Sequence, residues 1–178
     1  MNKNTTQLST IEMQAQMSAS VTEIWCACTE AKHLVNWWAP FGADMQVSEL
    51  APETGGVFHY SYLDGQHQQR WRRVYYTNVA EYATLSLELT VSDEQGHVLP
   101  LPLPGGLPQY LSATIALQNT TDGTLMTVTA TGPAGIATNT DSLPEEIAAM
   151  IERLKQYLET GTVSKHASIA SLTGTQLF

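Results

Sequence analysis

The chain has 178 residues, 43% of them hydrophobic, and its 17 acidic and 8 basic side chains leave a formal charge of -9. This length supports one domain with its own core, and the acidic balance without a basic tail argues against nucleic acid as a partner. No stretch approaches the roughly 18 continuous apolar residues of a membrane helix, and the opening residues, MNKNTTQLST, lack the apolar segment of a secretory signal. We therefore expect a cytoplasmic protein without membrane insertion.

One strand and two short helices are predicted first. Apolar and polar residues alternate over residues 11–17, which is typical of a half-buried strand. The sequence Ser20-Val-Thr-Glu23 is a capping box, so a helix should begin there. Thr29 can cap a second helix over residues 30–38, which a proline and a glycine then terminate.

Residues from 44 onward are predicted to form antiparallel strands joined by glycine turns. The pairs Gly55-Gly56, Asp64-Gly65 and Asp122-Gly123 offer the positive φ that tight hairpins need. Apolar and polar residues alternate most clearly over residues 84–91, which indicates one buried and one wet face. The predicted strands are Met45 to Leu50, Val57 to Leu63, Arg70 to Val79, Ala83 to Val91, Leu111 to Asn119 and Leu125 to Thr131.

A long amphipathic helix is the last predicted element. Ser142-Leu-Pro-Glu145 is a second capping box, with proline in the first turn, where its missing N–H costs nothing. One stripe of a helix of about five turns is apolar, and Gly161 is placed to end this helix. The stripe consists of Ile147, Met150, Ile151, Leu154, Tyr157 and Leu158.

Residues 97–110 read HVLPLPLPGGLPQY, and their prolines and glycines exclude a helix. Two interpretations of this segment stay open: a long surface loop, or a lid over an apolar opening or a contact to another subunit. We expect residues 1–7 to form an N-terminal extension, residues 8–160 to form the domain, and residues 161–178 to form a loose or partner-dependent tail.

The order of the elements predicts an α+β domain. Seven antiparallel strands with only one long helix to cover them should curl around that helix. A curved sheet that clasps a helix leaves a gap, which large side chains or a ligand must fill. The pattern thus predicts an internal cavity without identifying a ligand.

Several short motifs, taken in this order, resemble the START-like or SRPBCC superfamily. The motifs are Val21-Thr-Glu-Ile-Trp25, Thr29-Glu-Ala-Lys-His-Leu34, Trp37-Trp38-Ala-Pro40, Gly55-Gly56-Val-Phe58, Asp64-Gly65 and Gly123-Thr124. Within that superfamily the chain is most similar, over residues 8–160, to the AHSA-type branch, which is related to the activator of the heat-shock-protein-90 ATPase.

The resemblance implies a helix-grip fold, in which a bent antiparallel sheet surrounds a C-terminal helix and two small helices close one end of a deep hydrophobic cavity. Members of the superfamily bind lipids, sterols, polyketides or other apolar molecules, and some act as cyclases, hydrolases or co-chaperones. Two positions depart from the branch, because Ile147 stands where a tryptophan is common and Trp71 where a small residue is common. The shape of the cavity is therefore not carried over.

Aromatic side chains at alternate strand positions are the candidates for ligand binding. Phe58, Tyr60 and Tyr62 share one strand face. On the next strand, we assign Trp71, Arg73 and Tyr75 to the inner face. There, Arg73 would supply one cation suited to a carboxylate or enolate oxygen. The full candidate set is Trp38, Phe58, Tyr60, Tyr62, Trp71, Arg73, Tyr75, Met150, Leu154 and Tyr157.

Two alternatives to this assignment stay open. An aromatic stripe at this spacing is also typical of core packing alone. On the strand that carries Arg73, the residues at the alternate positions can equally point inward, or their arginines can form a solvated basic face. The residues at these alternate positions are Arg70, Arg72, Val74 and Tyr76.

The adjacent tryptophans Trp37 and Trp38 are expected to have different environments, because neighbouring residues on a helix are separated by about 100°. Trp37 follows Leu34 by three positions and shares its face. We therefore predict Trp37 in the core and Trp38 at the mouth of the cavity.

No catalytic residue, metal ligand or cofactor is predicted, and we do not expect an enzyme. His59 should point away from the inner aromatic residues, and His33 and His67 have no partner that the sequence identifies. The motifs of serine hydrolases, zinc proteases, kinases and dinucleotide-binding enzymes do not occur. Cys26 and Cys28, two positions apart on a helix, point to nearly opposite sides and are expected to be packing residues in a reducing compartment.

Three functions are compatible with these features. The leading hypothesis is binding of a small apolar or lipid-like molecule between the long helix and the concave sheet. The second is a co-chaperone-like module that binds a chaperone or associates with itself. The third is a cyclase or hydratase, in which Arg73 or a cavity tyrosine polarises a carbonyl.

Overall fold

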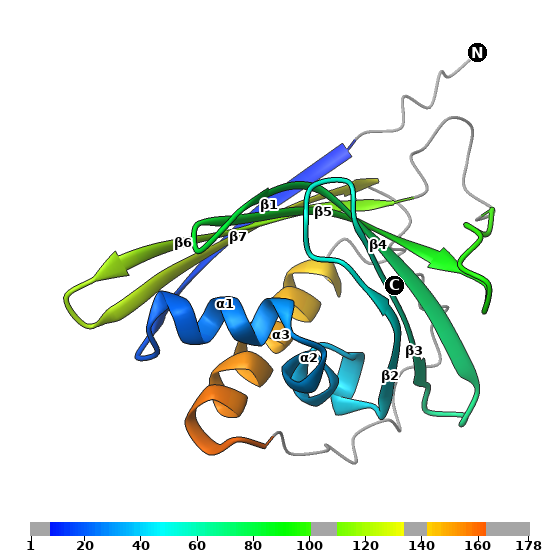
Figure 1. The fold of residues 1–178 in the computed structure, drawn as a ribbon, viewed down its shortest axis with the longest axis horizontal. Helices are drawn as coiled ribbons and strands as arrows, with labels where there is room; N and C mark the ends of the chain where they lie inside the picture. Colours follow the sequence, from blue (N-terminus) through cyan, green and yellow to red (C-terminus); the bar gives the residue numbers. More distant parts are fainter. Residues whose placement is uncertain (1–7, 101–109, 134–141, 163–178) are drawn as a thin grey trace.

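Seven antiparallel strands form one curved sheet around three helices in the computed structural model, which describes residues 8–100, 110–133 and 142–162 (Figure 1). The strands are β1 (Leu8–Met17), β2 (Met45–Leu50), β3 (Val57–Leu63), β4 (Gln69–Ala80), β5 (Thr84–Ser92), β6 (Leu111–Thr120) and β7 (Gly123–Pro133). The helices are α1 (Val21–Thr29), α2 (Ala31–Trp37) and α3 (Ser142–Thr160), with a short 3-10 turn, η1 (Pro40–Gly42).

The strands follow the order β1-β7-β6-β5-β4-β3-β2 across the sheet. β2 to β7 form a meander, and β1 closes the order by pairing with β7, so that Met17 lies opposite Thr124. In Figure 1 the sheet arches over the helices, and its concave face encloses the core with them. This arrangement confirms the predicted α+β helix-grip architecture, because one long helix can bury its apolar stripe only if the sheet bends around it.

The ends of the helices follow from local side-chain chemistry. The capping box that begins α1 is confirmed, because the Glu23 amide donates to Ser20 Oγ at 3.3 Å and the Ser20 amide donates to Glu23 Oε2 at 2.8 Å. The prediction that Thr29 caps α2 is wrong, since its hydroxyl donates back to the Trp25 carbonyl at 2.7 Å. Gly161 ends α3 as predicted, with φ of 72°.

Two of the three predicted glycine turns have the expected backbone conformation. Gly55 and Gly123 have positive φ values of 89° and 123°. In the turn between β3 and β4, by contrast, the left-handed residue is His67, with φ of 57°, and not the glycine after Asp64. The Asp64 carboxylate explains this, because it accepts hydrogen bonds from two later amides and shapes a longer turn.

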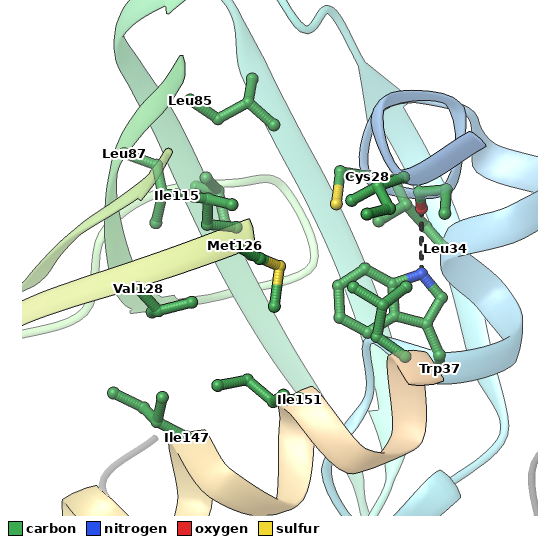
Figure 2. Packing of buried hydrophobic residues seen from close by; sticks show 14 of the residues in the cluster. Cys28, Leu34, Trp37, Leu85, Leu87, Ile115, Met126, Val128, Ile147 and Ile151 are labelled. Atoms are coloured by element: carbon green, nitrogen blue, oxygen red, sulfur yellow. Dashed lines mark hydrogen bonds between the residues drawn. The ribbon is translucent and has the colours of Figure 1, made fainter. Parts of the chain in front are cut away.

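The core lies between the concave face of the sheet and all three helices (Figure 2). Trp37 is 1% exposed, and its indole N–H donates to the Ala27 carbonyl at 2.9 Å, which ties α2 to α1. The prediction of Trp37 as a core residue is therefore confirmed. The residues that Figure 2 labels around it are Cys28, Leu34, Leu85, Leu87, Ile115, Met126, Val128, Ile147 and Ile151.

Four predictions concern residues or side chains that the structure does not describe. They are the N-terminal extension at 1–7, the central part of the proline-rich segment at 101–109, the side-chain contacts of Ser142, and most of the tail after Gly161.

The turn between β6 and β7 allows a direct test of the packing. We predict that Gly123→Ala lowers the free energy of unfolding by about 3 kcal/mol or more, because its Cβ would lie 2.2 Å from the Met17 carbonyl oxygen. Gly55→Ala is the matched control, since its φ is also positive but no heavy atom lies closer than 3.9 Å to the added carbon. The control should cost about 1 kcal/mol in urea unfolding. Equal costs would contradict the close approach.

Candidate functional site

The pairing of β3 with β4 decides which side chains face the helices. Tyr60 lies opposite Arg72, and Phe58 lies opposite Val74. Directly opposite residues of an antiparallel pair point to the same face of the sheet. Arg72 and Val74 therefore share the concave face with the β3 aromatic residues, and both are buried.

The inward placement of Trp71, Arg73 and Tyr75 that we predicted from the sequence is wrong. These residues lie opposite Ser61, His59 and Val57, on the convex face. Tyr75 is 44% exposed there. The opposite parity of β4, which the sequence left open, is the one that the hairpin register brings inside.

Four aromatic rings, which we call the aromatic ladder, run along the inner face from α2 to the end of β3. The ladder consists of Trp38, Phe58, Tyr60 and Tyr62. Its ring centroids are separated by 5.8 Å, 4.6 Å and 6.4 Å in that order, and Phe58 stacks on Tyr60 at 24°. The three β3 rings are buried, and Trp38 is half-buried at the α2 end. The candidate residues on β3 and Trp38 thus come together in one row.

Arg72 is buried beside this ladder with a side chain that is only 3% exposed. Its guanidinium lies over the Tyr62 ring, with Cζ 5.4 Å from the centroid. Nη2 donates to the Tyr62 hydroxyl and Nη1 to the Trp71 carbonyl, both at 3.0 Å. Within the described part of the chain, Nε has no hydrogen-bond partner and no carboxylate lies within ion-pairing distance.

Helix α3 carries two more charged side chains, whose charges act on the ladder tyrosines. Burial raises the pKa of Glu146, and the charges of Arg153 and Arg72 oppose this rise. Burial lowers the pKa of Arg153, whose Nε donates to the Trp37 carbonyl at 3.0 Å. We call Tyr60, Tyr62, Arg72, Glu146 and Arg153 the Arg72 cluster.

The tyrosines of this cluster stay neutral at physiological pH. Burial raises the pKa of Tyr60, against a lowering by the Arg72 charge and by a hydrogen bond with Trp38. Burial likewise raises the pKa of Tyr62, again against the nearby Arg72 charge. Neutral hydroxyls can both donate and accept, so the cluster offers hydroxyl groups as well as guanidinium N–H groups.

The three candidate residues on α3 have different surroundings. Leu154 is 1% exposed and belongs to the core, while Met150 and Tyr157 are half-buried at its border. The Tyr157 hydroxyl lies 2.7 Å from Nδ1 of His33 on α2, and the two rings meet edge to face. Tyr157 therefore joins two helices, a contact that the sequence did not reveal.

His59 points away from the aromatic ladder, as predicted, and it is buried on the convex side of the sheet. Its ring stacks on Trp71, with centroids 5.0 Å apart, and Nε2 lies 3.1 Å from the Asp93 carbonyl oxygen. The chain after β5 turns back here, because Val98 bridges to Ser92. This turn buries His59 to 5% exposure on the convex side.

Other kinds of site find no support among the described residues. No three His, Cys, Asp or Glu side chains gather there to hold a metal ion. Burial raises the pKa of Cys28 to about 12, so its thiol is a poor nucleophile. None of the described helices combines the length and the apolar character that crossing a membrane requires.

An open depression of about 280 Å³ lies on another part of the surface, where β1 ends beside the C-terminal half of α3. Its lining is mixed, with the polar side chains of Gln16, Asp122, Lys155 and Glu159 beside apolar and small residues. It is separate from the aromatic ladder.

Residues 18–159 match the family model described as Activator of Hsp90 ATPase homolog 1-like protein. The chain belongs to this family. The match covers most of the chain, and it confirms the resemblance that the tryptophan and glycine motifs indicated.

Solved structures of similar fold come from several bacteria. A protein from Arthrobacter aurescens superposes with a TM-score of 0.73 at 18% identity, over 89% of this chain and 91% of that chain. A protein from Staphylococcus epidermidis gives 0.72 at 17% identity, over 91% and 98%. DynU16, from the dynemicin biosynthetic locus, gives 0.64 at 19% identity, over 88% of this chain and 49% of its own. No curated protein matches the chain. At these identities the structures establish the fold.

The hydrogen bond between Arg72 and Tyr62 can be tested by removing one oxygen atom. We predict that Tyr62→Phe lowers the free energy of unfolding by about 1–2 kcal/mol, because a buried guanidinium N–H loses its acceptor. The control is Tyr75→Phe on the convex face, which should change stability by less than about 0.5 kcal/mol. Urea unfolding measures both, and an equal effect would contradict the inner placement of Arg72.

The two thiols should differ in reactivity. Cys28 is 3% exposed, whereas Cys26 is half-buried. We predict that iodoacetamide alkylates Cys26 slowly in the native protein at pH 8, because a hydrogen bond with Glu30 raises the pKa of this accessible thiol. Cys28 should be modified only after unfolding, because burial keeps its thiol protonated and out of reach. Peptide mass spectrometry distinguishes the two sites. Rapid modification of Cys28 in folded protein would contradict its burial.

Proposed function

We propose that this protein binds a small, largely apolar molecule between the aromatic ladder and helix α3. The observation that carries the proposal is the aromatic ladder itself, which lies on the concave face beside a few convergent polar groups. Ligand sites typically combine apolar and aromatic walls with a small number of polar side chains that orient the ligand. The Arg72 cluster supplies such groups.

A ligand would enter where the packing is least complete. Trp38, Met150 and Tyr157 are half-buried, while the β3 rings and Leu154 behind them are fully covered. In this proposal the half-buried side chains shift to admit the ligand, which then stacks on the ladder. Burial of apolar surface contributes about 25 cal/mol per Å², so about 300 Å² would supply roughly 7 to 8 kcal/mol before the entropic cost of binding.

Family membership supports the proposal only in general terms. DynU16 shares the fold and comes from a biosynthetic locus, which is in keeping with a role near small molecules. Fold alone does not determine function. The proposal therefore rests on this chain's own residues and assigns no reaction to them.

Two matched tryptophan variants test the proposal. We predict that the neutral fluorescent probe 1-aminoanthracene binds the protein saturably and that Trp38→Leu weakens this binding roughly tenfold, because one end of the ladder is lost. Trp71→Leu is the control, since Trp71 is also half-buried but lies on the convex face. Fluorescence titration measures both affinities.

The two variants distinguish binding at the aromatic ladder from binding elsewhere and from loss of structure. Equal weakening by both substitutions would place the probe elsewhere or reflect loss of structure, which circular dichroism checks. Absence of saturable binding, together with native mass spectra that show no co-purified small molecule in protein from its own host, would overturn the proposal.

The family description supplies a second candidate, which is a co-chaperone-like module that binds a chaperone of the Hsp90 type. Here the exposed surface would carry the function and the ladder would serve as core. The ATPase rate of the host's chaperone, measured with and without this protein, tests the candidate. Stimulation that survives Trp38→Leu would favour it over ligand binding.

A further inference from the structure

The Arg72 side chain is unusual because it is buried without an anionic partner among the described residues. Buried charges in proteins are nearly always paired, since an isolated charge loses its hydration. Here two guanidinium nitrogens bond to neutral oxygens, and Nε bonds to nothing in the described part of the chain. The inner face of the sheet therefore carries a buried positive group with one donor that has no partner among the described residues.

The charged side chains around Arg72 add to the excess of positive charge. The charged groups that act on Glu146 are the guanidiniums of Arg72 and Arg153. Arg70 and Asp64, which act on Tyr62, pair with each other at 2.7 Å, so the described charges around the cluster leave one positive group in excess. This balance favours a monoanion over a dianion such as phosphate, because a single negative charge neutralises the cluster. The Tyr62 hydroxyl accepts from Arg72 and still has its own proton to donate.

We propose that the ligand of the aromatic ladder carries one carboxylate, which accepts hydrogen bonds from Arg72 and Tyr62 while its apolar part lies against Phe58 and Tyr60. This inference rests on the function proposed above, and it narrows the ligand to amphipathic monocarboxylates. A carboxylate suits the site because its two oxygens match the planar fork of a guanidinium.

A pair of probes with the same chain length tests the carboxylate directly on the unmodified protein. Decanoate and decanol differ only in the head group, and isothermal titration calorimetry at neutral pH gives both affinities for the full chain. We expect decanoate to bind at least about tenfold more tightly than decanol, since charge-assisted hydrogen bonds to a buried arginine are strong. Equal affinities would overturn this inference and leave the proposed function standing.

The neighbouring arginine provides a matched control for Arg72. Arg72→Gln should weaken decanoate about tenfold and leave decanol unchanged, whereas Arg73→Gln on the convex face should change neither. If Arg72→Gln weakens both probes equally, the guanidinium acts on the structure alone and the inference falls. Thermal melting of each variant accompanies the titrations.

A substitution of Glu146 should change the affinity for decanoate in the opposite direction. It can be measured even if Arg72→Gln does not fold. Glu146→Gln removes a carboxylate on which the charges of Arg72 and Arg153 act, so decanoate should bind a few-fold more tightly while decanol binds as before. An unchanged or weaker affinity for decanoate would overturn the inference. If 1-aminoanthracene, decanoate and decanol all fail to bind, the proposed function falls and the inference falls with it.

Discussion

The pairing of Tyr60 with Arg72 across β3 and β4 is the contact on which the interior of this protein depends. It places a guanidinium among aromatic rings, and a shift of one residue would instead bring Trp71, Arg73 and Tyr75 inside. The arrangement is costly by itself, because the charge is desolvated. Hydrogen bonds to the Tyr62 hydroxyl and the Trp71 carbonyl, together with the Tyr62 ring beneath it, offset part of that cost.

The secondary structure could be predicted from the sequence because its signals are local. The capping box at Ser20, the period-2 alternation of the strands and the helical stripe of α3 each involve residues a few positions apart. The environment of Trp37 followed from its spacing to Leu34 on one helix face. The face shared by Phe58, Tyr60 and Tyr62 followed from strand geometry alone.

The inner face of β4 could not be predicted in the same way. One parity carries an arginine between two aromatic residues, and the other carries Arg72 beside Val74 and Tyr76, so both look amphipathic. Only the register with β3, set by a turn in which Asp64 caps later amides, decides between them. Glu146 and Arg153 were missed because a charged residue on a helix gives no sign of the distant strand that it will face. For the inner face of β4, the available signal was Val74 and Tyr76, which follow Arg72 at alternate positions.

Two contacts between α2 and α3 determine which member of the tryptophan pair meets the ladder. His33 lies against the Tyr157 hydroxyl, and one turn later along α2 the Trp37 carbonyl accepts from Arg153, which is one turn earlier along α3. Attachment at two points one turn apart prevents α2 from rotating about its own axis. Trp37 is thereby held inward and Trp38 is held against Phe58. The long helix α3 therefore fixes the rotational orientation of the short helix α2.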